Sequence, residues 1–130
     1  MIKISNEARG SLGVVEFSDL PFTPVRTFWI WKVPEGDTRG HHAHHSCEQF
    51  LAALSGMVSY TVTDRTNQKT TGVLVPGEGL YLPTQNWIVL SEFSPGCVVL
   101  VYCSHSYSES DYIRDLDEFL GNRSTDQSRS

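Results

Sequence analysis

Short apolar stretches rich in β-branched and aromatic residues recur along the chain, each bounded by turn-forming residues. They cover residues 12–16, 25–33, 48–54, 57–63, 71–75, 79–82, 87–93 and 97–103. Within the fourth stretch, Val58, Tyr60 and Val62 alternate with polar residues, so a strand would place all three on one face. Proline, glycine or short polar side chains predict turns at residues 34–37, 64–68, 76–79 and 94–96. Many short strands at this spacing predict an all-β sandwich or barrel.

The hydrophobic pattern changes from a strand period to a helical period near the C-terminus. Apolar side chains there fall at helical spacing, at Tyr112, Ile113, Leu116, Phe119 and Leu120. A start at Ser108, followed by Asp111 three residues later, and a stop at Gly121 predict one short α-helix packed against the strands. Residues 122–130 are polar and are expected to form a disordered tail, which leaves residues 1–121 as one domain.

Composition and charge narrow the class of protein. The chain has 130 residues, 39% of them hydrophobic, and a formal net charge of −5. This charge gives no electrostatic footprint for nucleic acid, and no apolar stretch approaches the ~20 residues of a membrane span. The N-terminus lacks the apolar core of a signal peptide, and three cysteines without CxxC spacing are typical of reduced thiols. We therefore expect a cytoplasmic protein with neither nucleic acid nor membrane as a partner.

Four of the five histidines lie within residues 41–45. If this segment is a strand, His42 and His44 point to one face and His41 and His45 point to the other. Two imidazoles on the inner face of a barrel can bind a metal ion or transfer protons. The alternative is a polar strand end in solvent, which a larger surrounding motif makes the weaker interpretation.

That larger motif runs from Gly36 through His42, His44 and Glu48 to Gly56, and its spacing follows the first motif of the cupins. The second cupin motif is only partly present, because Ile88 occupies the position of its histidine and cannot bind a metal. We therefore expect a cupin-like jelly-roll β-barrel with His42 and His44 in its mouth. A metal site formed by His42, His44 and Glu48 remains an open alternative.

The remaining motifs resemble one branch of the cupins, the dTDP-4-keto-6-deoxyglucose 3,4-ketoisomerases with their WxcM-like domains. The match extends over about residues 8–120 and is carried by residues 8–16, 20–22, 39–49, 79–87, 98–101 and 108–120. The combination of the histidine motif at 39–44 with Asp-Tyr-Ile-Arg-Asp at 111–115 is the most specific feature. One departure is Phe28-Trp29-Ile30-Trp31, where relatives more often carry tyrosines.

The resemblance implies an isomerase without a cofactor or a metal. Such an enzyme moves the ketone of a dTDP-4-keto-6-deoxyhexose from C4 to C3, on the route to dTDP-3-amino sugars. The reaction is a sequence of proton transfers through an enediol-like intermediate, for which imidazoles are suited near neutral pH. The resemblance also implies a homodimer in which the N-terminal strand is exchanged between subunits.

By the same resemblance, His42 and His44 are the catalytic pair, with His44 as the acid/base at carbon and His42 as the relay between oxygens. Arg39 and Arg26 are expected to bind the diphosphate, since a guanidinium offers two parallel hydrogen bonds to phosphate. Gln49 is a candidate to bind a sugar hydroxyl or an imidazole. Trp87 or Trp29 is a candidate to contact the thymine or the sugar. In the absence of a metal, Glu48 could orient a histidine by accepting its N–H.

Three other functions are compatible with parts of the sequence. A metal-dependent cupin enzyme would use His42, His44 and Glu48. A non-catalytic cupin module would bind the sugar nucleotide without turnover. A sugar epimerase on a similar barrel would exchange hydrogen at C3 and C5 without moving the ketone.

Overall fold

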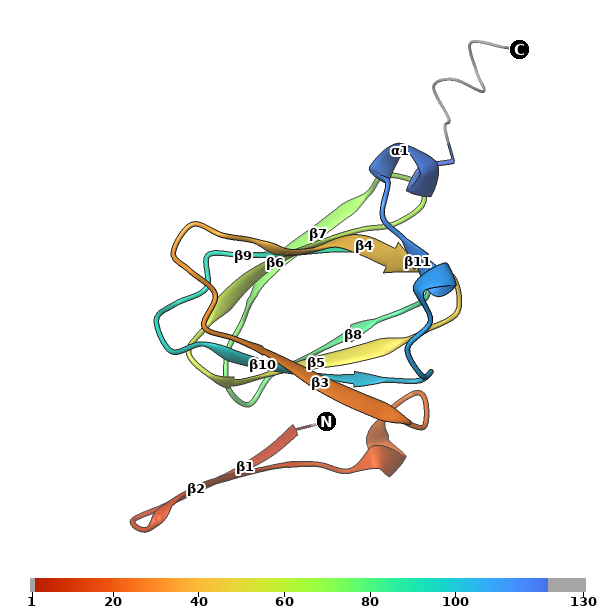
Figure 1. Ribbon diagram of the computed structural model, residues 1–130. Coiled ribbons are helices and arrows are strands. Elements are labelled where there is room, and N and C mark those ends of the chain that lie inside the picture. The colour runs from red at the N-terminus through yellow and green to blue at the C-terminus, as the bar shows by residue number, and fades with distance from the viewer. Residues whose placement is uncertain (1, 122–130) are drawn as a thin grey trace, which may run out of the picture.

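A computed structural model describes residues 2–121 and is built almost entirely of strands (Figure 1). The strands of this part of the chain are β1 (Ile2–Glu7), β2 (Gly10–Val15), β3 (Arg26–Trp31), β4 (Arg39–His44), β5 (Gln49–Ser55), β6 (Val58–Thr63), β7 (Lys69–Leu74), β8 (Gly79–Leu82), β9 (Trp87–Ser91), β10 (Val98–Cys103) and β11 (Tyr112–Ile113). Short 3-10 turns cover Phe17–Asp19 and Glu109–Asp111, and α1 covers Leu116–Phe119. None of the described helices is long and apolar enough to cross a membrane.

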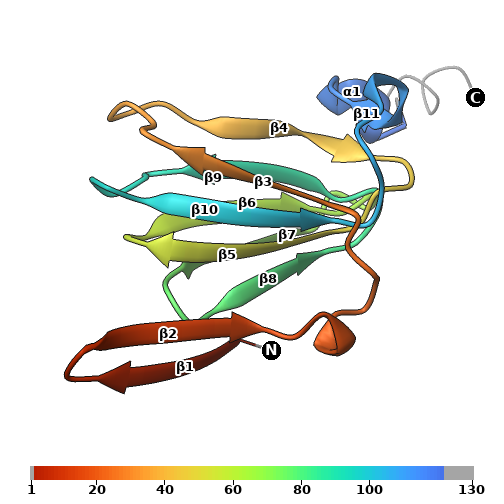
Figure 2. The same cartoon turned by 60° about the horizontal axis from the view of Figure 1, so that its bottom comes forward.

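Two antiparallel sheets face each other and form the body of the molecule (Figures 1 and 2). One has the strand order β3-β10-β5-β8 and the other has the order β11-β4-β9-β6-β7. The sequence correctly predicted an all-β jelly-roll architecture. The two sheets do not share a strand ladder, however, so the expected barrel is a sandwich of separate sheets.

The core between the sheets follows from the alternation of side chains along each strand. In β10, Val99, Val101 and Cys103 point inward and are almost fully buried, whereas the residues between them are half-buried on the outer face. Leu51, Val58, Leu74, Leu82, Ile88, Leu90 and Cys97 belong to the same buried cluster. Burying one such aliphatic side chain contributes roughly 1.5–3 kcal/mol, so this cluster fixes the register that places the functional residues.

The N-terminal hairpin β1–β2 lies outside the sandwich, against the outer face of the four-stranded sheet (Figure 2). Its base is held by Ile2 and Val15, which pack with the buried Phe50 and Ala52. The sequence indicated only the second of these strands. The first was missed because its side chains are mostly polar or exposed and lack the pattern of a half-buried strand.

The C-terminal segment is where the sequence-based prediction was wrong. The helix does not begin at Ser108, because Tyr112 and Ile113 pair with β4 as strand β11. It begins after Asp115, whose carboxylate accepts a hydrogen bond from the backbone N–H of Glu118. The stop at Gly121 is confirmed, since this glycine has a φ of 74°. The predicted tail at 122–130 lies outside the described residues.

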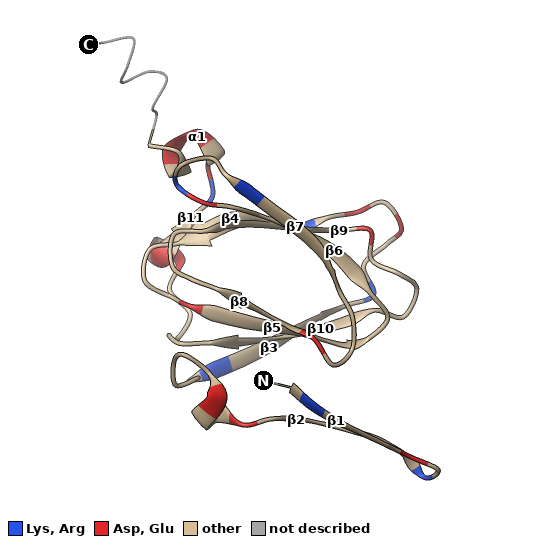
Figure 3. Cartoon of the chain, turned by 180° about the vertical axis from the view of Figure 1, so that it is seen from behind, with Lys and Arg blue, Asp and Glu red and all other residues tan. Residues whose placement is uncertain are grey.

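Charged side chains are distributed over many elements. On the face shown in Figure 3, lysine and arginine lie on separate strands, including β1, β3 and β7, and α1 carries acidic residues.

Candidate active site

A β-bulge in β4 determines the direction in which its histidine side chains point. The pairing of β4 with β9 shifts register between Gly40 and His42, and Gly40 and His41 both have positive φ, 97° and 60°. A Cβ at Gly40 would lie 2.6 Å from the carbonyl oxygen of Ile88, so only glycine fits there. Beyond the bulge, His42 and His44 share one face, as the sequence predicted, with their ring centroids 5.2 Å apart. His41 differs from the prediction, because it lines the same cavity as His42.

Strand β11 brings an aromatic ring against both histidines. Tyr112 is paired with His44 in the strand register. Its ring centroid lies 4.3 Å from that of His44 and 5.2 Å from that of His42. The three rings form one contiguous cluster, and the side chain of His44 is only 3% exposed.

Asp111 fixes the orientation of His44. Its carboxylate lies 3.2 Å from Nδ1 of His44 and accepts backbone N–H groups from Ser46 at 2.8 Å and Cys47 at 3.1 Å. Burial raises the pKa of Asp111, but these two N–H groups and His44 outweigh burial, and the net pKa is lowered. Because an ionised carboxylate can only accept, Nδ1 of His44 must donate to it. The lone pair of His44 is therefore on Nε2, which is buried and has no hydrogen-bond partner among the described residues.

Both histidines are held in the neutral form. The pKa of His42 is lowered from 6.5 to about 4, chiefly by burial and then by the nearby His44 and Arg114. Burial also lowers the pKa of His44, although Cys47 and Asp111 act in the opposite direction. Two neutral imidazoles side by side can each accept a proton at neutral pH, which is what an acid/base pair requires.

A cavity of about 400 Å³ opens between the two sheets beside the histidines. One part of its wall is apolar and consists of Phe28, Ile30, Leu51, Ile88, Leu90 and Val101. The other part comes largely from β4 and the β11 segment and consists of Thr38, Arg39, Gly40, His41, His42, Gln49, Tyr112 and Arg114. His42 faces this cavity directly, whereas His44 is not among the lining residues and lies against the ring of Tyr112.

The structure brings together only part of the predicted binding set. Arg39 and Gln49 line the cavity. Arg26 lies beyond it, donates from Nε to the carbonyl oxygen of His105 at 3.3 Å, and has its guanidinium over the rings of Phe28 and Tyr107.

The two predicted tryptophans lie away from the cavity. Trp87 is 6% exposed and packs against Phe119, with the ring centroids 5.7 Å apart. Trp29 is 58% exposed, because alternation along β3 turns it away from the core. Neither tryptophan is among the residues that line this cavity, and contact of either one with the substrate stays a prediction. Trp87 is a core residue, and Trp29 lies on the outer surface.

The predicted three-ligand metal site does not fit the geometry. The carboxylate of Glu48 accepts a hydrogen bond from the hydroxyl of Tyr81 at 2.5 Å, and this bond raises the pKa of Tyr81 to about 12. Glu48 is thus engaged with β8, and Asp111, not Glu48, orients a histidine. Within residues 2–121, no group of three or more histidine, cysteine, aspartate or glutamate side chains could hold a metal ion.

Sequence reasoning did not predict that Asp111 contacts His44 or that Tyr112 and Arg114 line the cavity. The segment was noted for its motif but was interpreted as the start of a helix. No local pattern indicates that Tyr112 and Ile113 add a strand beside β4. The carboxylate of Asp111 accepts the backbone N–H groups of Ser46 and Cys47, which are 65 and 64 residues away in the sequence. Only the folded chain brings these groups together.

Comparisons with known proteins identify the family and agree with the fold. The family model described as FdtA, WxcM-like, C-terminal matches residues 1–124. The TDP-4-oxo-6-deoxy-alpha-D-glucose-3,4-oxoisomerase of Aneurinibacillus thermoaerophilus is 34% identical over 114 residues, which cover 87% of this chain and 82% of that protein.

Two solved structures are similar over nearly the whole chain. One is a histidine-to-asparagine mutant of the 3,4-ketoisomerase QdtA from Thermoanaerobacterium thermosaccharolyticum in complex with TDP-4-keto-6-deoxyglucose, with a TM-score of 0.87, 32% identity and coverage of 93% of this chain and 88% of that one. The other is a 3,4-ketoisomerase from Helicobacter canadensis, with a TM-score of 0.85, 32% identity and coverage of 93% and 92%. The resemblance inferred from the motifs is confirmed, and this chain belongs to the WxcM-like, C-terminal family of FdtA.

Proposed function

We propose that this protein converts a dTDP-4-keto-6-deoxyhexose into its 3-keto isomer by proton shuttling between His44, His42 and the substrate. The related proteins are TDP-sugar 3,4-ketoisomerases, and this chain is an isomerase of that kind. The observation that carries the mechanism is the oriented pair: His44 is held by Asp111 through Nδ1, its Nε2 is unpartnered, and His42 lies beside it.

The proposed reaction begins when Nε2 of His44 takes the proton from C3. The electron pair forms the C3–C4 double bond, and negative charge develops on the C4 oxygen. His42 then carries a proton from the C3 oxygen to the C4 oxygen, and His44 returns a proton to C4, which leaves the ketone at C3. Each step moves one proton between neighbouring groups and needs neither an oxidant nor a metal ion.

Tyr112 controls access to the proposed base. Its ring lies 4.3 Å from the ring of His44, which is buried behind it, whereas His42 already faces the cavity. We therefore infer that the Tyr112 ring turns aside when the sugar binds, so that C3 reaches Nε2 of His44. This side-chain motion requires no change in β11, whose backbone is paired with β4.

The sugar nucleotide would extend from the cavity toward the arginines. Arg39 lines the cavity and Arg26 lies beside Phe28, one of the cavity's wall residues, so both are suited to bind the diphosphate. Gln49 lines the cavity and is suited to bind a sugar hydroxyl. We place the reaction in the cytoplasm on the route to dTDP-3-amino sugars, in keeping with its nucleotide-sugar substrate and its three unpaired cysteines.

We further propose that the protein is a homodimer that exchanges its N-terminal strand. The hairpin β1–β2 lies outside the sandwich and leaves a hollow of about 550 Å³ against β5 and β10. Large apolar side chains are exposed along its edges, including Leu12 at 63%, Ile4 and Leu54. A second copy that supplied its own hairpin would cover this apolar surface.

The decisive experiment follows the reaction of metal-stripped protein with dTDP-4-keto-6-deoxyglucose in D₂O by proton NMR. We expect loss of the C3 proton signal and growth of a 3-keto product, both abolished by His44→Asn. His45→Asn is the matched control, because His45 belongs to the same cluster but is exposed.

Other outcomes would overturn the proposal in distinguishable ways. Turnover only after a divalent metal is restored would establish a metal-dependent enzyme. Exchange at C3 and C5 without movement of the ketone would establish an epimerase. Tight binding of dTDP without turnover in either condition would establish a binding module.

A further inference from the structure

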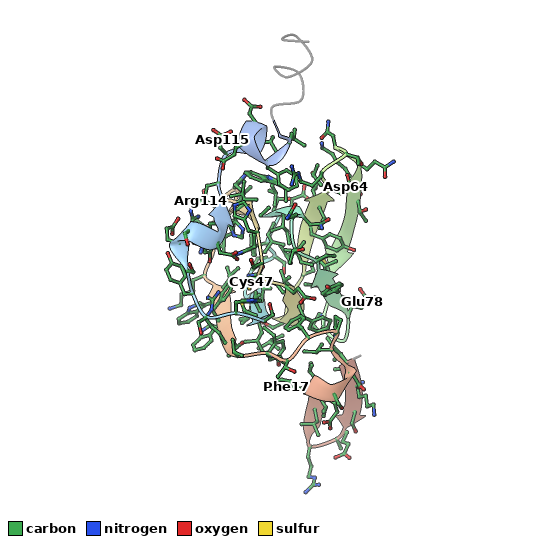
Figure 4. The ribbon with its side chains drawn as sticks, turned by 90° about the vertical axis from the view of Figure 1, so that its right-hand side faces the viewer. Phe17, Cys47, Asp64, Glu78, Arg114 and Asp115 are labelled. Carbon is green, nitrogen blue, oxygen red and sulfur yellow. The ribbon has the colours of Figure 1, made fainter. Side chains whose placement is uncertain are left out.

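Arg114 lies at the rim of the proposed active site but has no role in the mechanism above. It follows β11 directly and precedes α1, and Figure 4 shows it on that segment. It lines the cavity together with His42 and Tyr112. Since Tyr112 contacts both histidines, Arg114 is one ring away from the catalytic pair.

The guanidinium of Arg114 is fixed in direction before any substrate binds. Its Nε and Nη2 donate to the two carboxylate oxygens of Glu109 at 2.8 Å and 3.0 Å. Tyr107 donates to the same carboxylate at 2.6 Å. The guanidinium carbon also lies 4.2 Å from the ring centroid of Tyr112, but the anchor is Glu109 and does not depend on the position of that ring. The hydrogen bonds from Arg114 and Tyr107 lower the pKa of Glu109 to about 2, so this carboxylate remains a charged anchor.

This anchoring leaves donor capacity in the guanidinium. An arginine carries five N–H groups, and the two bonds to Glu109 use two of them. The proposed reaction needs a donor at this position, because removal of the C3 proton places negative charge on the C4 oxygen. The side chain of Arg114 is 51% exposed, so it lies at the open rim of the cavity, where an oriented cation can stabilise such a charge with little reorganisation during the step.

We propose that Arg114 donates hydrogen bonds to the C4 oxyanion of the enediolate and is therefore a catalytic residue of the ketoisomerase, an inference that rests on the proposed function. The electron pair released from the C3–H bond ends on the C4 oxygen, and the proton resides on His44. Arg114 stabilises this charge until His42 delivers a proton to the same oxygen. Its positive charge also helps to keep His42 neutral, and so able to receive the proton from the C3 oxygen.

Glu109 and Tyr107 act as positioning residues in this arrangement. Glu109 accepts from the guanidinium, and Tyr107 donates to the carboxylate of Glu109. Neither residue is among those that line the cavity. Glu109→Gln keeps the shape of the anchor and removes its charge, so it loosens Arg114 without removing it. We expect a fall in kcat smaller than that of an Arg114 variant, with KM unchanged.

The test compares Arg114→Gln and Arg114→Lys with Arg65→Gln. Arg65 is the matched control, because its guanidinium also lies over an aromatic ring, that of Phe119, but outside the cavity. For Arg114→Gln we expect kcat and the rate of C3 hydrogen exchange in D₂O to fall together by about 100-fold. The Kd for dTDP should stay within twofold, and Arg114→Lys should recover part of the exchange rate.

Two results would overturn the proposal. If kcat is unchanged while KM and the Kd for dTDP rise, Arg114 binds the diphosphate. If kcat falls only as far as it does in Arg65→Gln, with a matching fall in Tm, Arg114 is structural. If Arg114→Gln does not fold, Arg114→Lys and Glu109→Gln answer the same question. Failure of the proposed function itself is distinguishable, because the wild-type protein would then not move the ketone.

Discussion

Replacing Asp111 by asparagine should change the tautomer of His44 while the backbone fold is retained. The wild-type carboxylate accepts from Ser46 at 2.8 Å, from Cys47 at 3.1 Å and from Nδ1 of His44 at 3.2 Å. Asparagine has one acceptor oxygen. If that oxygen stays with Ser46, the new NH2 group faces two donors, the backbone N–H of Cys47 and the Nδ1–H of His44. The N–H of Cys47 stays opposed to it, whereas Nδ1 of His44 can accept from it in the other tautomer.

The magnitude follows from these contacts. The loss of one charge-assisted hydrogen bond at a side chain that is 17% exposed, together with one opposed donor, costs about 2–3 kcal/mol. For a chain of this length, that loss lowers Tm by roughly 6–10 °C. The amide favours the tautomer of His44 with its proton on Nε2, which cannot act as a base, so kcat should fall at least about 100-fold.

The pH dependence of stability provides an independent test of the role of Asp111. The folded pKa of Asp111 lies below its ordinary 3.8. Its contribution to stability is therefore fully present above that value and is lost as the pH falls through the folded pKa. The stability difference between the wild-type protein and the variant should be constant above about pH 5 and should shrink at lower pH.

The assay combines NMR turnover at pH 7.5 with urea unfolding over a range of pH. Asp115→Asn is the control, because it also removes a carboxylate, but one that caps α1 by accepting the backbone N–H of Glu118. That control should lose stability without losing kcat. Wild-type kcat in Asp111→Asn would refute the argument that Asp111 orients the base, and unchanged stability would refute the energetic role of its hydrogen bonds.

Three further predictions concern His42, Trp87 and Glu48. The pKa of His42 is about 4 in the fold against an ordinary 6.5, so acidification from pH 6.5 to pH 4 lowers the free energy of unfolding by roughly 3 kcal/mol. In urea unfolding over that pH range, His42→Gln should lose less stability than the wild-type protein. The same dependence of stability on pH in both proteins would contradict the burial of His42. Trp87→Leu should lower the free energy of unfolding in urea by about 2 kcal/mol and leave KM unchanged. A raised KM without a loss of stability would show that Trp87 contacts the substrate. Glu48→Gln should keep metal-free turnover within twofold and lower the pKa of Tyr81 from about 12 toward 10 in an ultraviolet titration. A hundredfold loss of metal-free turnover would instead give Glu48 a direct role in the reaction.

The main features of the fold could be predicted from the sequence because they are encoded locally. Alternation within single strands and the turn residues between them identified most of the strands of both sheets. The irregular elements escaped prediction. Strand β1 has mostly exposed side chains, and β11 is only two residues long within a segment whose apolar spacing matches a helix. In such segments tertiary pairing outweighs local preference.

The candidate site likewise has features that local sequence predicts and features that depend on tertiary contacts. That His42 and His44 share a face follows from the two-residue period of a strand, and the family follows from motifs that can be counted along the chain. What surrounds them depends on contacts across long sequence separations. Asp111 reaches His44 across 67 residues, and the bulge at Gly40 turns His41 toward the same cavity. Burial of Trp87 and the bond from Tyr81 to Glu48 are equally non-local. The sequence by itself determined which side chains could transfer a proton. Only the tertiary structure decided which of them are oriented, desolvated and facing the cavity, because hydrogen bonds and burial are properties of neighbours in space.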